Sequence, residues 1–234
     1  MNPTDDTVER RDAGAGGRMN RIYRHQRRFY DATRSFLLPG RRALIEALQP
    51  PLGSTVLEVG CGTAWMLIQA ARRYPEAQLY GLDVSSEMLA TARSKVARAG
   101  LSTRIALGEA DATTFDPVAV FGRATFDRIL FSYALSMIPD WMRAVDRAAG
   151  AVAAGGSLHI VDFAGFEAAP RLLRRARDGC LARFSVTSRT EMATHLRSLC
   201  ATRDFDLAID RCLGGYTQRA VLSHRRSAAH HAAN

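Results

Sequence analysis

Cysteine is scarce in this sequence of 234 residues, and long apolar runs are absent. The 4 cysteines form no C-x-x-C pair and share no spacing with nearby histidines, which argues against a disulfide framework and against a structural zinc site. No run approaches the ~18 consecutive apolar residues of a membrane-spanning helix. Residues 1–17 contain no apolar core, so we do not expect them to be a secretory signal. The composition therefore predicts a cytoplasmic protein.

Lysine is almost absent as well. Of the 32 basic residues, Lys95 is the one lysine and the other 31 are arginines, and 23 acidic residues leave a formal net charge of +9. Arginine binds phosphate or carboxylate oxygens through two parallel hydrogen bonds, which lysine cannot do. The charge thus indicates an anionic partner, either nucleic acid or a membrane surface. A genome whose codons favour arginine would explain the overall bias but not its clustering.

Two segments concentrate the arginines. In residues 18–42, Arg21, Arg24 and Arg28 share one face of an expected helix, with apolar side chains beside them. We expect this segment to dock on an anionic membrane surface without spanning it. The alternative is a lid packed on the core with its arginines in solvent. Residues 171–177 form a second cluster, for which a solvated helix face is the alternative. Nucleic acid is not expected, because there is no N/D-P-P-Y/F sequence and no RNA-binding module.

Between two polar tails, short β-rich runs alternate with helical patterns, and the length suits one domain of ~100–200 residues. The expected strands are residues 55–60, 78–83, 104–108, 127–133 and 157–163. The expected helices are residues 19–34, 39–49, 64–74, a segment from Ser85 or Ser86 to Gly100, 141–152, 170–183, and a helix to Thr202 opened by a capping box of Ser188 and Glu191. A hairpin of residues 204–210 and 216–222 follows. The alternation predicts a mostly parallel sheet covered on both faces, to which the hairpin adds an antiparallel edge.

The strongest local signal is E-V-G-C-G-T at residues 58–63, where an expected buried strand runs into a Gly-x-Gly turn and then a helix. Gly60 and Gly62 suit this turn because a side chain would block a ligand approaching the backbone, and because such a turn can require positive φ. The alternative is a tight strand–helix turn without a ligand. Ligands of such sheets bind beyond the carboxyl ends of the strands, where the strand order reverses.

Three carboxylates lie at or near the expected strand ends. Asp83 ends the second strand, about 20 residues after the glycine turn, where an acid can accept hydrogen bonds from both ribose hydroxyls of a nucleoside. Asp111 follows the third strand, and Glu58 lies inside the first, where a buried carboxylate needs a cationic or hydrogen-bonding partner. Together the three acids suit a nucleoside that bears ammonium and sulfonium groups, and they would repel a pyrophosphate.

Two common nucleotide sites are not expected. A dinucleotide fingerprint would place Gly or Ala at position 65, but the residue is Trp65, which is too large for close contact between helix and strand. The Lys-Ser/Thr pair of a P-loop is missing too. A nicotinamide cofactor and ATP are therefore unlikely ligands on sequence grounds.

With E-V-G-C-G-T, G-L-D-V-S at 81–85 and D-A at 111–112, residues 40–225 resemble the class I S-adenosylmethionine-dependent methyltransferases. The resemblance implies an α/β, Rossmann-like fold: a seven-stranded, mostly parallel sheet with helices on both faces and a C-terminal antiparallel hairpin. It implies S-adenosylmethionine as the cofactor and no metal. The expected organisation is a disordered tail (1–17), an N-terminal helical lid or substrate segment (18–50), the methyltransferase domain (51–225) and a second disordered tail (226–234).

A narrower resemblance lies outside these motifs. R-I-Y-R-H-Q-R-R-F-Y-D-A-T-R at 21–34 and F-S-Y-A-L-S-M-I-P-D-W at 131–141 are similar to the betaine-lipid N-methyltransferases, which methylate the amine of diacylglycerylhomoserine three times. This similarity implies a lipid or small-molecule amine as acceptor, an upstream aminocarboxypropyl transferase of the same pathway as a partner, and peripheral association with the inner face of the membrane. The sequence departs from related enzymes at Ala64-Trp65-Met66, where a smaller residue and an Arg-Asn pair are common.

The motif positions imply a set of cofactor contacts. Asp83 would hold the ribose, Asp111 would accept from the adenine amino group, and Glu58 would serve the amino group of the methionine part. Tyr30 and Arg34 would close over the cofactor from the leading helix, with Arg34 facing its carboxylate. The other implied contacts are Gly60, Cys61, Gly62, Val84, Met88, Ala112 and Phe131.

On the acceptor side, the resemblance places Tyr133 between cofactor and acceptor as the catalytic residue, with Tyr23 and Trp141 as further substrate contacts. The alternatives are a packing face for the aromatic residues of the leading helix and a core position for Trp141. No residue is recognisable as a dedicated base, so the acceptor amine would lose its proton to water or to a nearby carboxylate or phenol.

The sequence therefore predicts an S-adenosylmethionine-dependent N-methyltransferase that trimethylates the amine of diacylglycerylhomoserine in betaine-lipid synthesis. One alternative keeps fold and cofactor but takes another acceptor, such as phosphatidylethanolamine, a quinone precursor or a soluble metabolite. The other is a cofactor-binding subunit without catalytic activity.

Overall fold

The computed structural model describes residues 38–183 and 186–225. Its elements are α2 (Arg41–Leu48), β1 (Thr55–Val59), α3 (Trp65–Arg73), β2 (Gln78–Asp83), α4 (Ser86–Arg98), β3 (Ile105–Glu109), α5 (Pro117–Phe121), β4 (Phe126–Ser132), η1 (Leu135–Met137), α6 (Trp141–Gly150), β5 (Val152–Phe163), α7 (Arg171–Arg183), α8 (Met192–Thr202), β6 (Phe205–Cys212), η2 (Leu213–Gly215) and β7 (Thr217–His224). The predicted tails and the helix predicted at 19–34 lie outside the described residues. None of the helices within the described ranges is long and apolar enough to cross a membrane.

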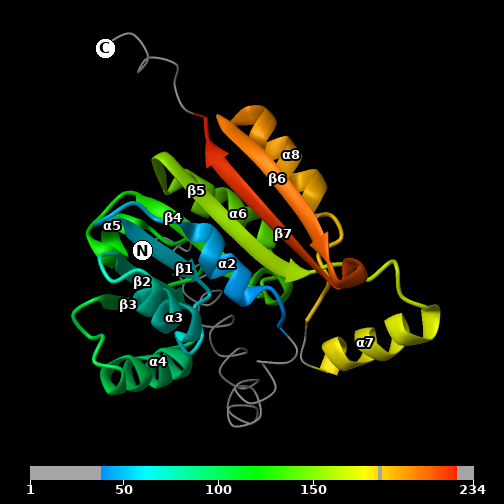
Figure 1. Ribbon diagram of the computed structural model, residues 1–234, viewed down its shortest axis with the longest axis horizontal. Coiled ribbons are helices and arrows are strands. Elements are labelled where there is room, and N and C mark those ends of the chain that lie inside the picture. Colours follow the sequence, from blue (N-terminus) through cyan, green and yellow to red (C-terminus); the bar gives the residue numbers. More distant parts are fainter. Residues whose placement is uncertain (1–37, 184–185, 226–234) are drawn as a thin grey trace, which may run out of the picture.

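The strands form one seven-stranded sheet in the order β3-β2-β1-β4-β5-β7-β6 (Figure 1). The first five strands pair in parallel, whereas β7 pairs antiparallel with both β5 and β6. The predicted α/β, Rossmann-like fold with a C-terminal antiparallel hairpin is confirmed. The strand order reverses between β1 and β4, which is the point where sheets of this kind bind ligands.

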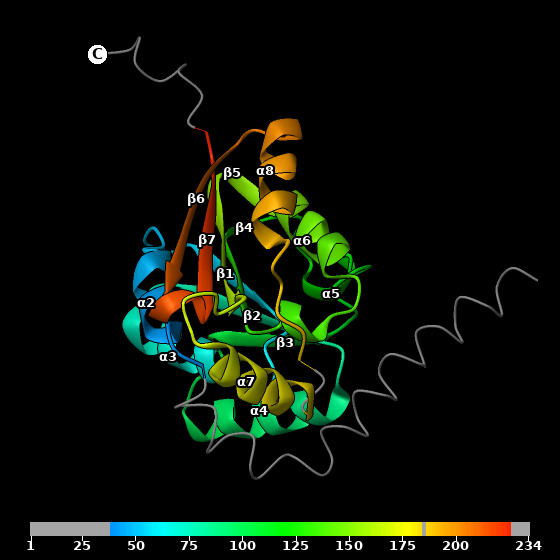
Figure 2. The same ribbon diagram turned by 90° about the vertical axis from the view of Figure 1, so that its right-hand side faces the viewer.

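Helices cover both faces of the sheet, each over its own apolar cluster (Figure 2). On one face, Leu44 of α2, Leu67 of α3 and Leu89 of α4 pack against the sheet. On the other face, α6 and α8 cover the core with Val145 and Leu196, and α5 adds partly buried side chains. Every residue of β1 is buried, as expected for a central parallel strand with both faces covered.

One predicted helix start is wrong. Ser188 and Glu191 do not form a capping box, because α8 begins at Met192 and Glu191 is its N-cap, without a side-chain cap hydrogen bond. Tertiary contacts hold the preceding residues instead. The Arg189 backbone N–H donates to the Phe163 carbonyl, and the Arg189 carbonyl accepts from Gln218. Ser188 is therefore held along the sheet and not in a helical turn.

The stretch before Phe126 contains the short helix α5, which is not among the expected helices. Its Pro117 stands in the first turn, and the Asp116 carboxylate accepts from the Val118 backbone N–H at 2.9 Å. Both are ordinary helix-start signals. In addition, β5 begins at Val152 and not at residue 157, and its pairing with β4 has a register shift between Phe126 and Arg128.

Candidate functional site

The turns after β1 and β4 meet at the point where the strand order reverses. Gly60 follows β1 with a φ of +74°, and a Cβ atom added to it would lie 2.6 Å from the Cβ of Ala134, which follows β4. A larger residue at this position would therefore need both an unfavourable φ and a shift of the neighbouring turn. Gly62 also has positive φ, at +54°. The predicted positive φ is confirmed, and at Gly60 protein packing adds a second requirement for glycine. The approach of a ligand to this backbone remains a prediction.

Asp83, at the end of β2, is fixed beside this turn. One of its carboxylate oxygens accepts from the Gly62 backbone N–H at 2.7 Å, and the other accepts from the Ser85 backbone N–H at 2.9 Å. A carboxylate oxygen has two lone pairs and can accept more than one hydrogen bond. This contact joins Asp83 to the glycine turn, whereas the binding of ribose by Asp83 remains a prediction.

Asp111 lies on the neighbouring side, beyond β3. Its Oδ1 accepts from the backbone N–H and the hydroxyl of Thr113, both at 2.7 Å. These two hydrogen bonds form a local turn between Asp111 and Thr113, and this turn fixes the direction of the Asp111 carboxylate. Its Oδ2 has no hydrogen-bond partner within the described part of the chain, which leaves an acceptor for an amino group at the carboxyl edge of the sheet.

Tyr133 directly follows β4 and adopts a left-handed backbone conformation with a φ of +57°. An aromatic residue rarely does so, and such outliers cluster at functional sites. Its hydroxyl donates to the Pro39 carbonyl, and its ring lies 4.7 Å from that of Phe163. Burial, together with the nearby Asp162 carboxylate, raises the pKa of the Tyr133 phenol above its usual range. The phenol therefore stays protonated at neutral pH.

Arg41 is a residue that the sequence motifs do not single out. It is the first residue of α2 and is buried at 7% exposure. Its Nε donates to the Ser132 hydroxyl at 3.2 Å, and its guanidinium lies 4.5 Å above the ring of Trp65. A buried cation thus stands between the end of β4 and the start of α3. The large residue at position 65 provides a cation–π surface for it.

A buried polar network holds the turn that follows Tyr133, and the sequence gives no signal for it. Asp162 is fully buried at the end of β5, where its carboxylate accepts from the backbone N–H groups of Ser136, at 3.0 Å, and Phe163, at 2.8 Å. Burial raises the pKa of Asp162 to about 6, against these hydrogen bonds. Arg189 donates to the carbonyls of Leu135 and Ile138. The network fixes η1 and thereby the position of Tyr133.

The other predicted site residues within the described ranges are buried, except Val84. Glu58 is buried in β1, beside Gly81 of β2 and Leu130 of β4. Four are also buried: Cys61, Met88, Ala112 and Phe131. Val84 is half-buried between β2 and α4. Trp141 is 5% exposed, packed against His195 and below the Arg189 guanidinium. This packing favours its core alternative, and its role in acceptor binding remains a prediction.

Three predicted contacts, Tyr23, Tyr30 and Arg34, lie outside the described residues. The described site therefore consists of the carboxyl edge of β1, β2, β3 and β4, with Asp83 and Asp111 on one side and Arg41 and Tyr133 on the other.

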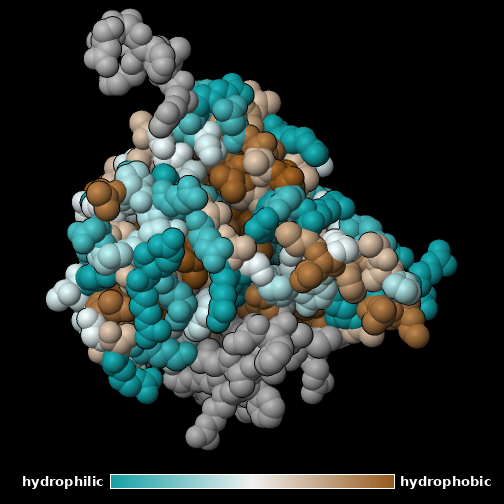
Figure 3. Space-filling model, in the orientation of Figure 1, coloured by the Kyte–Doolittle hydropathy of each residue, from teal (hydrophilic) through white to brown (hydrophobic). Residues whose placement is uncertain are grey.

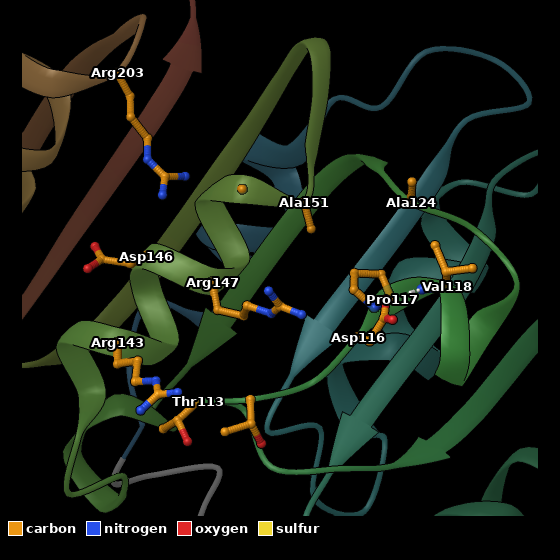
Figure 4. Close-up of a pocket in the computed structure, with 12 residues that line it drawn as sticks. Thr113, Asp116, Pro117, Val118, Ala124, Arg143, Asp146, Arg147, Ala151 and Arg203 are labelled. Carbon is orange, nitrogen blue, oxygen red and sulfur yellow. Dashed lines mark hydrogen bonds between the residues drawn. The ribbon is translucent and has the colours of Figure 1, made fainter.

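A groove of about 550 Å³ lies elsewhere, between α5 and α6. Figure 4 shows Arg143 and Arg147 of α6 and Arg203, just before β6, around it. Several of its polar groups serve the fold: Arg147 donates to the Phe115 carbonyl, and Asp146 pairs with His195 at 3.0 Å. The groove is not at the reversal of strand order, and we do not assign the cofactor to it.

Comparison with known proteins gives this geometry its context. Residues 56–156 match a family model described as a methyltransferase domain. The matched segment covers less than half of the chain. It contains the glycine turn, the strand-end acids and Tyr133, and it ends within β5.

Similar proteins lead to the same class. A phosphatidylethanolamine N-methyltransferase of Cereibacter sphaeroides is 35% identical over 135 residues, which cover 58% of this chain and 62% of the relative. A demethylmenaquinone methyltransferase of Listeria monocytogenes serotype 4a is 30% identical over 124 residues, which cover 52% of this chain and 50% of the relative. The match thus spans between half and two thirds of the length of these relatives.

The crystal structure of a SAM-dependent methyltransferase from Aquifex aeolicus has the same fold, with a TM-score of 0.61 at 17% identity, covering 84% of this chain and 95% of that chain. The family match and the named relatives are methyltransferases, and the solved structure shares the fold of this chain. They leave the acceptor open, since the two relatives named above act on different classes of molecule.

Proposed function

We propose that the chain binds S-adenosylmethionine at the reversal of strand order and transfers its methyl group to the amine of a lipid. The observation that carries the cofactor site is the Asp83 carboxylate held by Gly62 at 2.7 Å. It joins the predicted ribose acceptor to the predicted glycine turn in one rigid unit.

The residues present fit this cofactor. Asp83 would accept from the ribose hydroxyls, and the Oδ2 atom of Asp111 would accept from the adenine amino group. Arg41 supplies a cation for the carboxylate of the methionine part, a role that the sequence assigned to Arg34, and Glu58 supplies a carboxylate for its ammonium group. When bound, S-adenosylmethionine supplies an electrophilic methyl group on a sulfonium.

The chain's own contribution to the reaction is orientation and exclusion of water. The strained backbone of Tyr133 and the network behind η1 hold the edge of the acceptor site in one geometry, and positioning of this kind can lower a barrier by ~7–11 kcal/mol in favourable cases. Aromatic rings tolerate positive charge developing on an amine, by ~0.5–2 kcal/mol each. Because the Tyr133 phenol stays protonated, the amine proton leaves to water or to another group.

Two similarities support a lipid amine as acceptor. Residues 21–34 and 131–141 resemble the betaine-lipid N-methyltransferases, and the relative from Cereibacter sphaeroides is by name an N-methyltransferase of phosphatidylethanolamine. We therefore propose diacylglycerylhomoserine as the acceptor, methylated three times. An upstream aminocarboxypropyl transferase would supply it. A quinone precursor is the second candidate, favoured by the demethylmenaquinone methyltransferase relative.

The test is incubation with radiolabelled S-adenosylmethionine and total lipid, followed by chromatography of the lipid products. We expect label in a trimethylated diacylglycerylhomoserine, and much less label with the Asp83→Ala variant. That variant should also bind the cofactor ~1–3 kcal/mol more weakly, since it loses hydrogen bonds to the diol. Asp116→Ala, which removes an acid of the α5 start, is the matched control.

Label in phosphatidylcholine or a methylated quinone would reassign the acceptor. Cofactor binding without transfer to any of these lipids would contradict the proposed activity and favour a cofactor-binding subunit.

A further inference from the structure

Helix α7 exposes two adjacent leucines at the side of the molecule. Leu172 is 80% exposed and Leu173 is 57% exposed, and they are two of five large apolar residues that are exposed in the described ranges. Figure 1 shows α7 set apart from both helix layers, beyond the carboxyl end of β5. The space-filling view shows apolar surface at this end of the molecule, surrounded by hydrophilic side chains (Figure 3).

Arginines surround the two leucines. Arg171, Arg174 and Arg175 have no acidic partner in the described part of the chain. The one acidic residue of the helix, Asp178, is neutralised by Arg177, whose Nη2 lies 2.6 Å from its carboxylate. The helix therefore keeps three unbalanced positive charges near its exposed leucines.

Helical geometry gives α7 an outer face. Leu172 shares one side of the helix with Arg175 and Ala176, which follow it by three and four residues. The opposite side carries Leu181, which packs against the apolar cluster under α2 and α3, and Arg177. The face that points away from the body is thus a leucine flanked by arginine and small residues, a pattern typical of helices that lie in a membrane interface.

Arg177, in the middle of α7, attaches the helix next to the proposed acceptor side of the site. The Arg177 guanidinium donates to the Ala164 carbonyl at 2.7 Å and lies 5.4 Å from the ring of Phe166 and 5.9 Å from that of Tyr216. Tyr216 in turn packs against Phe163 at 5.7 Å, and Phe163 contacts Tyr133. Contacts through the rings of Tyr216 and Phe163 thus link Arg177 of α7 to Tyr133.

We propose that α7 docks on an anionic lipid surface. Leu172 and Leu173 would insert beneath the headgroups, and Arg171 and Arg175 would bind the phosphates. Arg174 lies on the side of Leu181 and is only partly exposed, so we assign it no phosphate contact. Docking would hold the carboxyl edge of the sheet against the membrane from which the acceptor enters. The inference deepens the proposed function and rests on it for the identity of the acceptor. The docking surface itself rests on charge complementarity and exposed apolar area.

Sedimentation with vesicles tests the surface. The full chain is mixed with vesicles of phosphatidylcholine alone or of phosphatidylcholine with phosphatidylglycerol. We expect binding to the anionic vesicles that weakens as salt is added, because screening shortens electrostatic reach. The Arg171→Gln/Arg175→Gln variant should bind about tenfold more weakly or worse, as expected for two basic residues near anionic headgroups. Leu172→Ser/Leu173→Ser should show a loss of about tenfold from the missing apolar contact.

Matched controls separate docking from general charge and apolarity. Arg72→Gln/Arg197→Gln removes two exposed arginines from α3 and α8, and Leu52→Ser removes a leucine that is 91% exposed between α2 and β1. Both should bind vesicles like the unaltered chain. Because all these side chains are exposed, the thermal midpoint of each variant should be unchanged.

Equal binding of the α7 variants and the unaltered chain would overturn the proposal, as would equal binding to neutral and anionic vesicles. A dimer in sedimentation velocity that the leucine substitutions dissociate would overturn it in favour of a second copy of this chain. Cofactor titration of the α7 variants should give unaltered affinity. If α7 binds vesicles but no lipid is methylated, the proposed function fails while the docking surface stands.

Discussion

Arg41 is the main electrostatic feature of the site that only the structure identifies. Its guanidinium is buried between the Ser132 hydroxyl and the Trp65 ring, so in the proposed site it would meet the cofactor carboxylate with little competition from water. A hydrogen bond between charged groups contributes ~1.5–3 kcal/mol under such conditions. This side chain can therefore account for a large share of the affinity for the methionine part of the cofactor.

The Arg41→Gln variant should bind S-adenosylmethionine at least tenfold more weakly by calorimetry. The affinity of Arg41→Lys for S-adenosylmethionine should lie between that of Arg41→Gln and that of the unaltered chain, because lysine keeps the charge of arginine but not its planar fork. Arg42→Gln is the matched control, since Arg42 is the next residue in the helix and is exposed. Unchanged affinity in Arg41→Gln would remove Arg41 from the site.

Tyr133 should affect turnover more than binding. Tyr133→Ala removes the ring beside Phe163, whereas Tyr133→Phe removes only the hydroxyl that donates to Pro39. We expect kcat to fall far more than cofactor affinity in Tyr133→Ala, and a smaller fall in Tyr133→Phe. Steady-state kinetics and calorimetry on the same preparations measure both, with Tyr80→Phe as the control. A parallel loss of cofactor affinity would instead assign Tyr133 to cofactor binding.

At the scale of elements, the contact between the turns after β1 and β4 decides the shape of the site. Gly60 and Ala134 come from strands that are neighbours in the sheet but far apart in the chain. Their close approach brings the glycine turn, Asp83 and Tyr133 to one place.

Gly60→Ala should lower the free energy of unfolding by more than the ~1 kcal/mol that a positive φ alone costs. Gly100→Ala is the matched control, because Gly100 has a φ of +70° and nothing within 4 Å of an added Cβ. The double variant Gly60→Ala/Ala134→Gly should recover part of the loss, since it removes the contact between the two Cβ atoms but not the strained φ. Equal losses for Gly60→Ala and Gly100→Ala in denaturant titration would show that the contact is unimportant.

At the scale of the whole molecule, Asp162 connects the parallel sheet to the C-terminal hairpin region. Its carboxylate binds η1, Arg189 binds the carbonyls around η1, and Gln218 of β7 binds the Arg189 carbonyl. The pKa of Asp162 is raised from 3.8 to about 6 by burial. The native state thus keeps a proton that the unfolded chain has already released.

The contribution of Asp162 to stability should therefore decline as pH rises from about 4 to about 6. Asp162→Asn cannot titrate, although its NH2 group cannot accept a hydrogen bond, so one of the two backbone N–H groups loses its acceptor at all pH values. We expect the difference in unfolding free energy between the unaltered chain and this variant to shrink across that window in denaturant titrations. Parallel pH profiles for the two proteins would contradict a raised pKa at this position.

The sequence alone predicts the fold class and the chemistry of half of the site. Strand and helix periodicities give the alternation of elements because each central strand is buried on both faces and each helix on one. The glycine turn and Asp83 are predictable because positive φ and a strand-end acid are local requirements, and they lie within 25 residues of each other. The start of α4 is also predictable from a local signal, the N-cap Ser85, whose hydroxyl accepts from the Met88 backbone N–H.

The tertiary structure decided what depends on contacts between distant segments. Ser188 and Glu191 match a capping pattern, but hydrogen bonds to β5 and β7 hold this segment in another conformation. Arg41 is one of many arginines in the sequence, and only the packing of α2 against β4 and α3 buries it beside Ser132 and Trp65. Burial and the arrangement of partners set the roles of such residues, and a local sequence pattern contains neither.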